Sequence, residues 1–193
     1  MTKPMLQKFV PLFFFLLPFL NNILPVYAQV SVNELDWIWP VDGVISDTYG
    51  SRNGRHRGVD VASDLDTPVY AVANGMVTRS YYSQSYGHVI FIKHDEGYET
   101  VYAHLQKRLV EKGERVKKGD TIGTMGSTGH SSGPHLHFEV HKNFWTVHKE
   151  NAIDPFLIFG SARVGDHVFA HQKSLNEASP VWKSDRIAPS GKK

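Results

Sequence analysis

Two short segments of the chain combine residue types that bind metal ions. One is the pentapeptide His56-Arg57-Gly58-Val59-Asp60, and the other is the run from His135 to His141. On an extended strand, His135 and His137 would point to the same face, with Cα atoms about 6.6 Å apart. Two imidazoles that share a face repel each other when both are protonated, so a metal ion or a catalytic task would justify the arrangement.

The chain contains no cysteine, so a zinc site must be built from His, Asp and Glu. Catalytic zinc sites use three such ligands and leave a fourth position for water, whose pKa falls to about 7. We expect His56, Asp60 and His137 to hold one Zn²⁺ ion. His141 shares the face of His137 and is the next candidate ligand.

Two further histidines could serve a hydrolytic reaction. His135, two residues from His137, could act as general base for the metal-activated water. His104, at the end of an apolar run, could stabilise the oxyanion of a tetrahedral intermediate. We expect His88 and His94, which flank another apolar run, to be exposed and to take no part in the site.

Residues 1–28 have the organisation of a secretory signal peptide. Lys3 and Lys8 precede an apolar block at residues 9–20, and Val26-Tyr27-Ala28 then supplies the exit of such a peptide, with the small Ala28 last. The block is shorter than the about 20 apolar residues of a membrane-spanning helix. We therefore expect cleavage after Ala28 and export to the periplasm or the exterior, without stable membrane insertion. An uncleaved membrane anchor is the alternative.

The charge balance argues against nucleic acid as a partner. Removal of Lys3 and Lys8 with the signal peptide would leave 19 basic residues against 19 acidic ones. Binding to nucleic acid requires a concentrated basic surface. The absence of cysteine also excludes disulfides as a source of stability in an exported protein.

Short apolar runs between glycine-centred turns extend from Trp39 to about Phe159. Such runs predict strands, and Asn74-Gly75 between two of them predicts a β-hairpin. After a short lead-in at residues 29–38, we expect one all-β domain at residues 39–159. Its core would be an antiparallel sandwich or an open barrel. Residues 160–193 lose the apolar rhythm, and we predict that they form a disordered polar tail.

Residues 39–159 contain a series of short motifs in a fixed order. They are Tyr49-Gly50-Ser51-Arg52, His56-x-Gly58-Val59-Asp60, Thr67-Pro68-Val69-Tyr70-Ala71, Asn74-Gly75-x-Val77, Tyr86-Gly87, Tyr102-Ala103-His104-Leu105, Val116-x-x-Gly119-Asp120-x-Ile122-Gly123, Gly126-x-Thr128-Gly129, the run from Gly133 to Glu139, and Asp154-Pro155. This series resembles that of the lysostaphin/LytM-type zinc endopeptidases, which cleave peptide cross-links of bacterial peptidoglycan. Asp66, His88 and Ser132 stand where the family commonly has Gly, Asn and Thr. None of these three is a predicted metal or catalytic position.

The resemblance implies zinc ligands at His56, Asp60 and His137 and catalytic roles for His104 and His135. It also implies an antiparallel β core with the site in a groove. The activity would be zinc-dependent hydrolysis of peptide stems or cross-bridges of peptidoglycan. The alternative is a non-catalytic member of the fold that binds and activates a cell-wall amidase, as family members that have lost metal ligands do.

Overall fold

The computed structural model describes residues 35–170 of the chain. The predicted signal peptide, most of the lead-in and residues 171–193 lie outside the described residues. Between residues 35 and 170, no helix is long and apolar enough to cross a membrane. Two four-residue helices, α1 (Ser51–Gly54) and α2 (Phe156–Phe159), accompany a fold that is otherwise built from strands, so the all-β prediction is confirmed.

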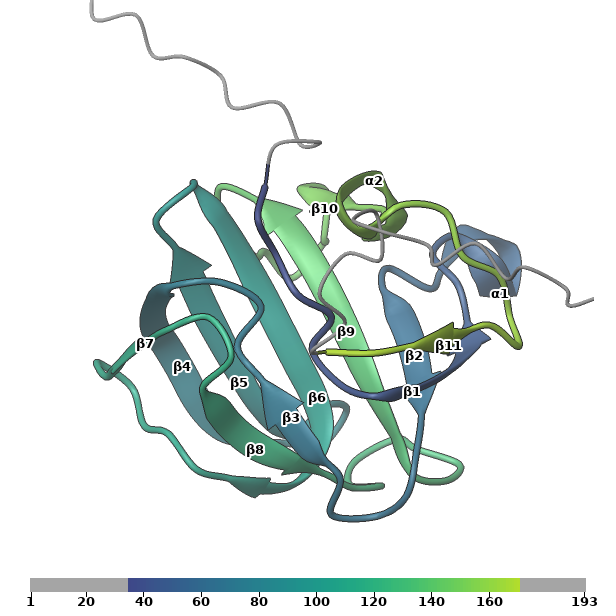
Figure 1. The fold of residues 1–193 in the computed structure, drawn as a ribbon, viewed down its shortest axis with the longest axis horizontal. Coiled ribbons are helices and arrows are strands. Elements are labelled where there is room, and N and C mark those ends of the chain that lie inside the picture. Colours follow the sequence, from purple (N-terminus) through teal and green to yellow (C-terminus); the bar gives the residue numbers. More distant parts are fainter. Residues whose placement is uncertain (1–34, 171–193) are drawn as a thin grey trace, which may run out of the picture.

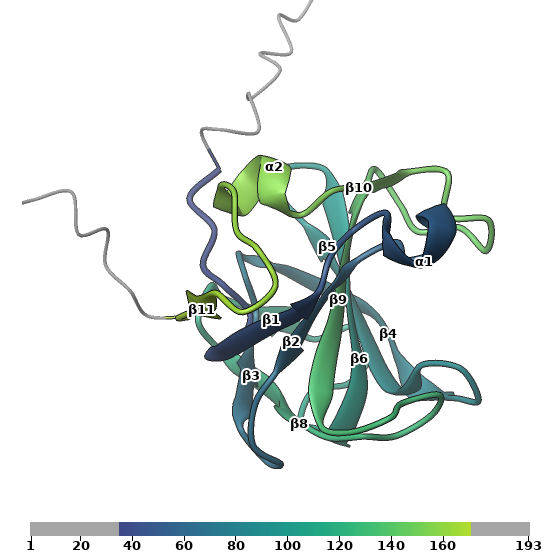
Figure 2. The same cartoon turned by 90° about the vertical axis from the view of Figure 1, so that its right-hand side faces the viewer.

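All strand pairs in the described residues are antiparallel and belong to one open sheet (Figure 1). The strands are β1 (Gly43–Asp47), β2 (Val59–Ala62), β3 (Pro68–Tyr70), β4 (Gly75–Ser83), β5 (Gly87–His94), β6 (Tyr98–Arg108), β7 (Arg115–Val116), β8 (Thr121–Met125), β9 (His135–Lys142), β10 (Ala152–Ile153) and β11 (His167–Val168). The main path runs β11-β1-β2-β9-β6-β5-β4-β7, with β10 paired to β9 and β8 paired to both β3 and β6. In Figures 1 and 2, β3 and β8 fold over one face of the sheet as a second layer, and α1 lies on the opposite side of β9.

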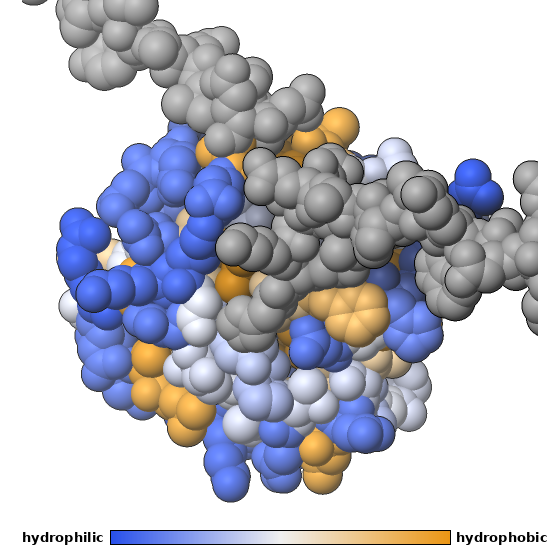
Figure 3. Space-filling view, viewed as in Figure 1, coloured by the Kyte–Doolittle hydropathy of each residue, from blue (hydrophilic) through white to orange (hydrophobic). Residues whose placement is uncertain are grey.

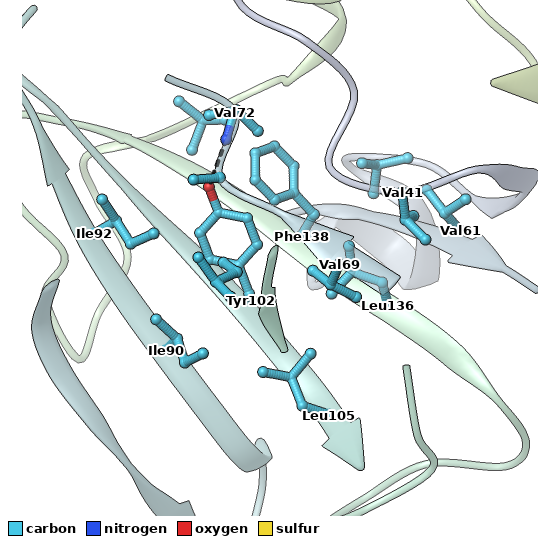
Figure 4. Close-up of a cluster of buried hydrophobic side chains, with 14 of the residues drawn as sticks. Val41, Val61, Val69, Val72, Ile90, Ile92, Tyr102, Leu105, Leu136 and Phe138 are labelled. Atoms are coloured by element: carbon cyan, nitrogen blue, oxygen red, sulfur yellow. Dashed lines mark hydrogen bonds between the residues drawn. The ribbon is translucent and has the colours of Figure 1, made fainter. Parts of the chain in front are cut away.

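The main hydrophobic core lies between these two layers (Figure 4). Alternation along β5 directs Ile90 and Ile92 into this core, where the Tyr102 hydroxyl accepts a hydrogen bond of 3.2 Å from the backbone N–H of Val72. The other face of β5 and β6 carries a second buried cluster made of Val89, Phe91, Val101 and Ala103. Tyr86 and Trp145 cover that second cluster and also line the groove described below.

The hairpin predicted at Asn74-Gly75 does not form. β3 pairs with β8, whereas β4, which begins at Gly75, pairs with β5 and β7. Pairing of β3 with β8 buries Val69 and Ile122 completely in the main core. The Asn-Gly signal is local, and this long-range burial outweighs it.

The sheet extends further along the chain than the predicted boundary at Phe159. β11 lies within the predicted polar tail, pairs with β1 and buries Val168. A two-residue strand is too short to produce a recognisable alternation, so the sequence pattern could not reveal it. At the opposite end of the main path, hydrophilic residues cover β4 and β7 (Figure 3), which suits a strand that ends the sheet.

Candidate active site

Three of the predicted site residues meet where β2 and β9 run side by side. The register of these strands places Asp60 directly opposite His137. His56 follows α1 and returns to the same place through a left-handed turn. The residues of that turn with positive φ are Gly50, Arg52, Asn53 and Gly54.

The polar atoms of these three side chains converge. Oδ1 of Asp60 lies 3.0 Å from Nε2 of His56 and 2.7 Å from Nδ1 of His137, and the two nitrogens are 3.0 Å apart. The exposed fractions are 3% for His56, 3% for Asp60 and 7% for His137, so all three residues are buried. A group of one carboxylate oxygen and two imidazole nitrogens is a donor set that zinc binds.

The far nitrogen of each histidine is held by an acceptor, which orients the near nitrogen toward the group. Nδ1 of His56 donates to the carbonyl of Thr48 over 2.8 Å, and Nε2 of His137 donates to Glu139 over 2.8 Å. This is the arrangement that fixes the tautomer of a metal-binding histidine. The residues present therefore fit a zinc ion.

Electrostatics in the group favour the ionised carboxylate. Burial raises the pKa of Asp60, but hydrogen bonds from His137 and His56 outweigh it and lower that pKa far below its usual range. Burial lowers the pKa of His137, yet its bonds to Asp60 and Glu139 raise that pKa to about 9. A metal ion bound at Nδ1 would displace the proton that this raised pKa favours.

His104 and His135 lie beside the group, with their ring centroids 4.8 Å apart. Nδ1 of His104 donates to the carbonyl of Thr128 over 2.8 Å, and Nδ1 of His135 donates to the carbonyl of Gly133 over 2.9 Å. Each ring therefore presents Nε2 for chemistry, and that of His135 lies 3.9 Å from Oδ2 of Asp60. Burial, with repulsion from two neighbouring histidines, lowers the pKa of His104 to about 4.

His104 also has a strained backbone. Its φ is 61°, in the left-handed region that residues other than glycine seldom occupy. Such a conformation costs on the order of 1–3 kcal/mol and is concentrated at functional sites. The strain lies at the residue that carries a predicted catalytic ring.

Four of the five predicted site residues line a groove with two hollows, and His56 lies buried behind them. One, of about 340 Å³, contains His104 and His137 and is walled by Tyr86, Trp145 and Lys149. The other, of about 280 Å³, contains Asp60 and His135 and is lined by smaller residues from Ser132 to Pro134. Arg52 lines both hollows.

A larger hollow, of about 620 Å³, lies elsewhere, between Trp37, Trp39 and residues 159–170. None of the five predicted site residues lines it. Its size is therefore no guide to the chemistry, which requires the converging donors of the groove.

Two residues near the site had no assigned role in the sequence interpretation. Glu139 is fully buried and accepts hydrogen bonds from His137 and His141, so His141 binds this carboxylate and is not part of the metal group. Arg52 forms an ion pair of 2.7 Å with Oδ2 of Asp60. The alternation of residues 135–141 places Glu139 on the same face of the strand as His137. The sequence pattern could therefore have indicated the contact between Glu139 and His137.

Comparison with known proteins gives one family match, to Peptidase family M23, over residues 54–155. The chain is 50% identical over 97 residues to the peptidoglycan DD-endopeptidase ShyC of Vibrio cholerae, covering 48% of this chain and 22% of that protein. It is 40% identical over 105 residues to the murein hydrolase activator NlpD of Escherichia coli, covering 54% of this chain and 27% of that protein. The chain thus matches only about a quarter of the length of these relatives.

Solved structures show the same fold. The catalytic domain of the antimicrobial peptidase lysostaphin from Staphylococcus simulans aligns with a TM-score of 0.52 at 36% identity, covering 60% of this chain and 88% of that chain. A zinc-containing peptidase from Vibrio cholerae aligns with a TM-score of 0.54 at 32% identity, covering 65% of this chain and 39% of that chain.

Proposed function

We propose that this chain, which belongs to peptidase family M23, is a zinc-dependent endopeptidase that hydrolyses peptide cross-links of bacterial peptidoglycan. The observation that carries the proposal is the convergence of His56, Asp60 and His137 beside the rings of His104 and His135. The similarity to a relative named a peptidoglycan DD-endopeptidase supports the substrate class.

Zinc held by His56, Asp60 and His137 would supply a Lewis acid that polarises the scissile carbonyl and lowers the pKa of water. His135 is placed to accept a proton, because its Nδ1 is bonded to a backbone carbonyl and its Nε2 faces Asp60. It takes the proton of the attacking water and passes it to the leaving amine nitrogen. His104, whose ring is held through Nδ1 by Thr128 and lies beside His137, would stabilise the developing oxyanion. That role requires a proton on Nε2, which the negative charge of the intermediate would favour.

The groove suits an extended peptide substrate. The two hollows share Arg52 as a lining residue, and each contains one predicted catalytic histidine. A chain that crosses from one hollow to the other passes the metal group. Stem peptides or cross-bridges of peptidoglycan can be bound in this extended form.

Peptidoglycan lies outside the cytoplasm, so the proposal includes export. We propose that residues 1–28 direct the chain to the periplasm or the exterior and are then removed. A mature protein whose N-terminal sequence begins at Gln29 is the expected result, and a mature N-terminus at Met1 would contradict it.

The second candidate function is a non-catalytic activator of a cell-wall amidase, because one relative is named a murein hydrolase activator. A regulator that binds without hydrolysis has no need of the ligands and catalytic rings. In this chain all five are present: the polar atoms of His56, Asp60 and His137 converge, and the two catalytic rings lie beside them. The endopeptidase is therefore the better supported function.

Digestion of purified peptidoglycan, with and without a chelator, tests the proposal. We expect release of uncrosslinked muropeptides that stops when zinc is removed, and mass analysis of the products identifies the bond. The variant His137→Ala should be inactive. Absence of cleavage by folded, zinc-loaded protein, together with stimulation of an amidase, would favour the activator instead.

A further inference from the structure

Glu139 is a fully buried carboxylate beside a proposed zinc ligand. It lies on β9 two residues after His137, on the same face of the strand, and its exposed fraction is 0%. A buried charge without partners costs several kcal/mol. Its presence here therefore requires donors that hold it.

Four side chains supply these donors. Oε1 accepts hydrogen bonds from Nε2 of His137 at 2.8 Å, from the Tyr86 hydroxyl at 2.8 Å and from Nζ of Lys149 at 2.6 Å. Oε2 accepts one from Nε2 of His141 at 2.7 Å. His137 is the one donor of the four that also belongs to the metal group.

We infer that Glu139 is a positioning residue of the metal site, which fixes the ring of His137 so that Nδ1 faces the zinc ion. The inference rests on the proposed function. With Nε2 donating to the carboxylate, the lone pair of Nδ1 is left for the metal ion, toward His56 and Asp60. A carboxylate partner also makes the imidazole a better electron donor.

The same carboxylate connects the metal ligand to the wall of the groove. The ring of Tyr86 stacks on His137 at a centroid distance of 6.1 Å, and its hydroxyl accepts a bond of 3.2 Å from Nε1 of Trp145. Nζ of Lys149 lies 4.8 Å from the centre of the Tyr86 ring. Tyr86, Trp145 and Lys149 all line the hollow that contains His137, so Glu139 holds the ligand and this wall in one arrangement.

The chain offers a matched control in Glu99. This second buried glutamate is 3% exposed and lies on β6, opposite His141 in the register with β9. It accepts hydrogen bonds from Thr78, Arg79 and the backbone of Trp145. These contacts include no residue of the metal group, so neutralising Glu99 removes a buried charge without disturbing a ligand.

Zinc affinity of the full chain tests the inference, measured by competition with a chromophoric chelator. We expect Glu139→Gln to bind zinc about 10–100-fold more weakly than the wild type, and Glu99→Gln to bind it as the wild type does. The oxygen of a glutamine can still face Nε2 of His137, but it carries no charge and accepts that hydrogen bond more weakly, while its amide NH2 group faces Nε2 of His141. Urea unfolding of the zinc-free proteins, measured in parallel, reports the general cost of removing each charge.

Glu139→Asp serves as a second variant if Glu139→Gln does not fold. Aspartate keeps the charge, but its shorter side chain withdraws from His137, so zinc binding should again weaken. Wild-type affinity in either folded variant would overturn the inference, as would an equal loss in Glu139→Gln and Glu99→Gln. A wild type that binds no zinc would instead contradict the proposed function itself, so the two failures are distinguishable.

Discussion

The guanidinium of Arg52 holds one oxygen of Asp60 and leaves the other for the two histidines. Nη2 of Arg52 lies 2.7 Å from Oδ2, whereas Oδ1 is the oxygen within 3.0 Å of His56 and His137. The ion pair thus favours a carboxylate that offers a single oxygen to zinc. A ligand of that kind helps to keep a position open for water and substrate.

We predict that Arg52→Ala lowers peptidoglycan hydrolysis about tenfold or more, because a lost outer partner of a metal ligand costs that much. Arg52→Lys should be intermediate, since lysine keeps the charge but not the planar fork. The fold should persist, because the Arg52 side chain is 57% exposed and the buried Asp60 keeps its hydrogen bonds to His56 and His137. Arg55→Ala, in the same turn, is the control. Wild-type turnover by folded Arg52→Ala would contradict the prediction.

Removing the two catalytic candidates should separate chemistry from metal binding. We predict that His104→Ala and His135→Ala each lower kcat about 10²–10⁴-fold. Both should retain zinc, since neither belongs to the group formed by His56, Asp60 and His137. The exposed His130 lines the hollow of His104, so His130→Ala controls for loss of a groove histidine. Metal content by mass spectrometry and turnover are the measurements, and zinc loss with inactivation would make these residues ligands instead.

Gly58, which directly precedes β2, packs closely against β9 at the site. A Cβ atom there would be 2.4 Å from the carbonyl oxygen of Phe138 and 3.0 Å from Cε1 of His137. We predict that Gly58→Ala separates the strands, destabilises the fold by about 1–3 kcal/mol and weakens zinc binding. A Cβ at Gly133 would meet nothing within 4 Å, so Gly133→Ala is the control. Urea unfolding and zinc titration should distinguish the two alanines, and identical behaviour would contradict the packing argument.

Motif spacing was sufficient to predict the family and the meeting of the site residues. The predicted resemblance is confirmed by the family match and by the lysostaphin structure. The alternation of residues 135–141 indicated that His135 and His137 share a face, and both lie at the groove. What spacing could not supply is the pairing of β2 with β9, which places Asp60 opposite His137. That register depends on contacts between segments far apart in the chain.

The polar interior was the part that sequence reasoning missed. The role of Glu139 depends on its hydrogen bonds from Tyr86 and Lys149. Tyr86 is far from Glu139 in the sequence, and Lys149 lies in an irregular loop. His94 was predicted to be exposed, and this was wrong, since its exposed fraction is 2%. Its end of β5 is covered by Trp37, whose ring centroid lies 4.9 Å from that of His94. The periodicity of the strands could not predict this contact, because Trp37 belongs to the segment before the first strand.

The burial of His94 has a consequence for stability. Burial lowers the pKa of His94 to about 4, although its bonds to backbone carbonyls oppose the change. Its Nδ1 donates to the carbonyl of Asn74 over 3.0 Å, and its Nε2 lies 2.7 Å from the hydroxyl of Thr100. The unfolded chain has a histidine pKa of about 6.5. Between these values the unfolded state binds the extra proton, so stability falls as the pH falls.

We therefore predict that the wild type has a larger free energy of unfolding than His94→Gln, and that this difference is greatest above pH 6.5. The difference should shrink as the pH falls from about 6.5 toward 4, by up to on the order of 3 kcal/mol. Glutamine can keep a donor for Asn74 and an acceptor for Thr100, but it does not titrate. Urea unfolding of both proteins at each pH gives the difference, and contributions shared by both, such as that of His104, cancel. A difference that stays constant from pH 8 to pH 4 would show that His94 is not a source of the acid sensitivity.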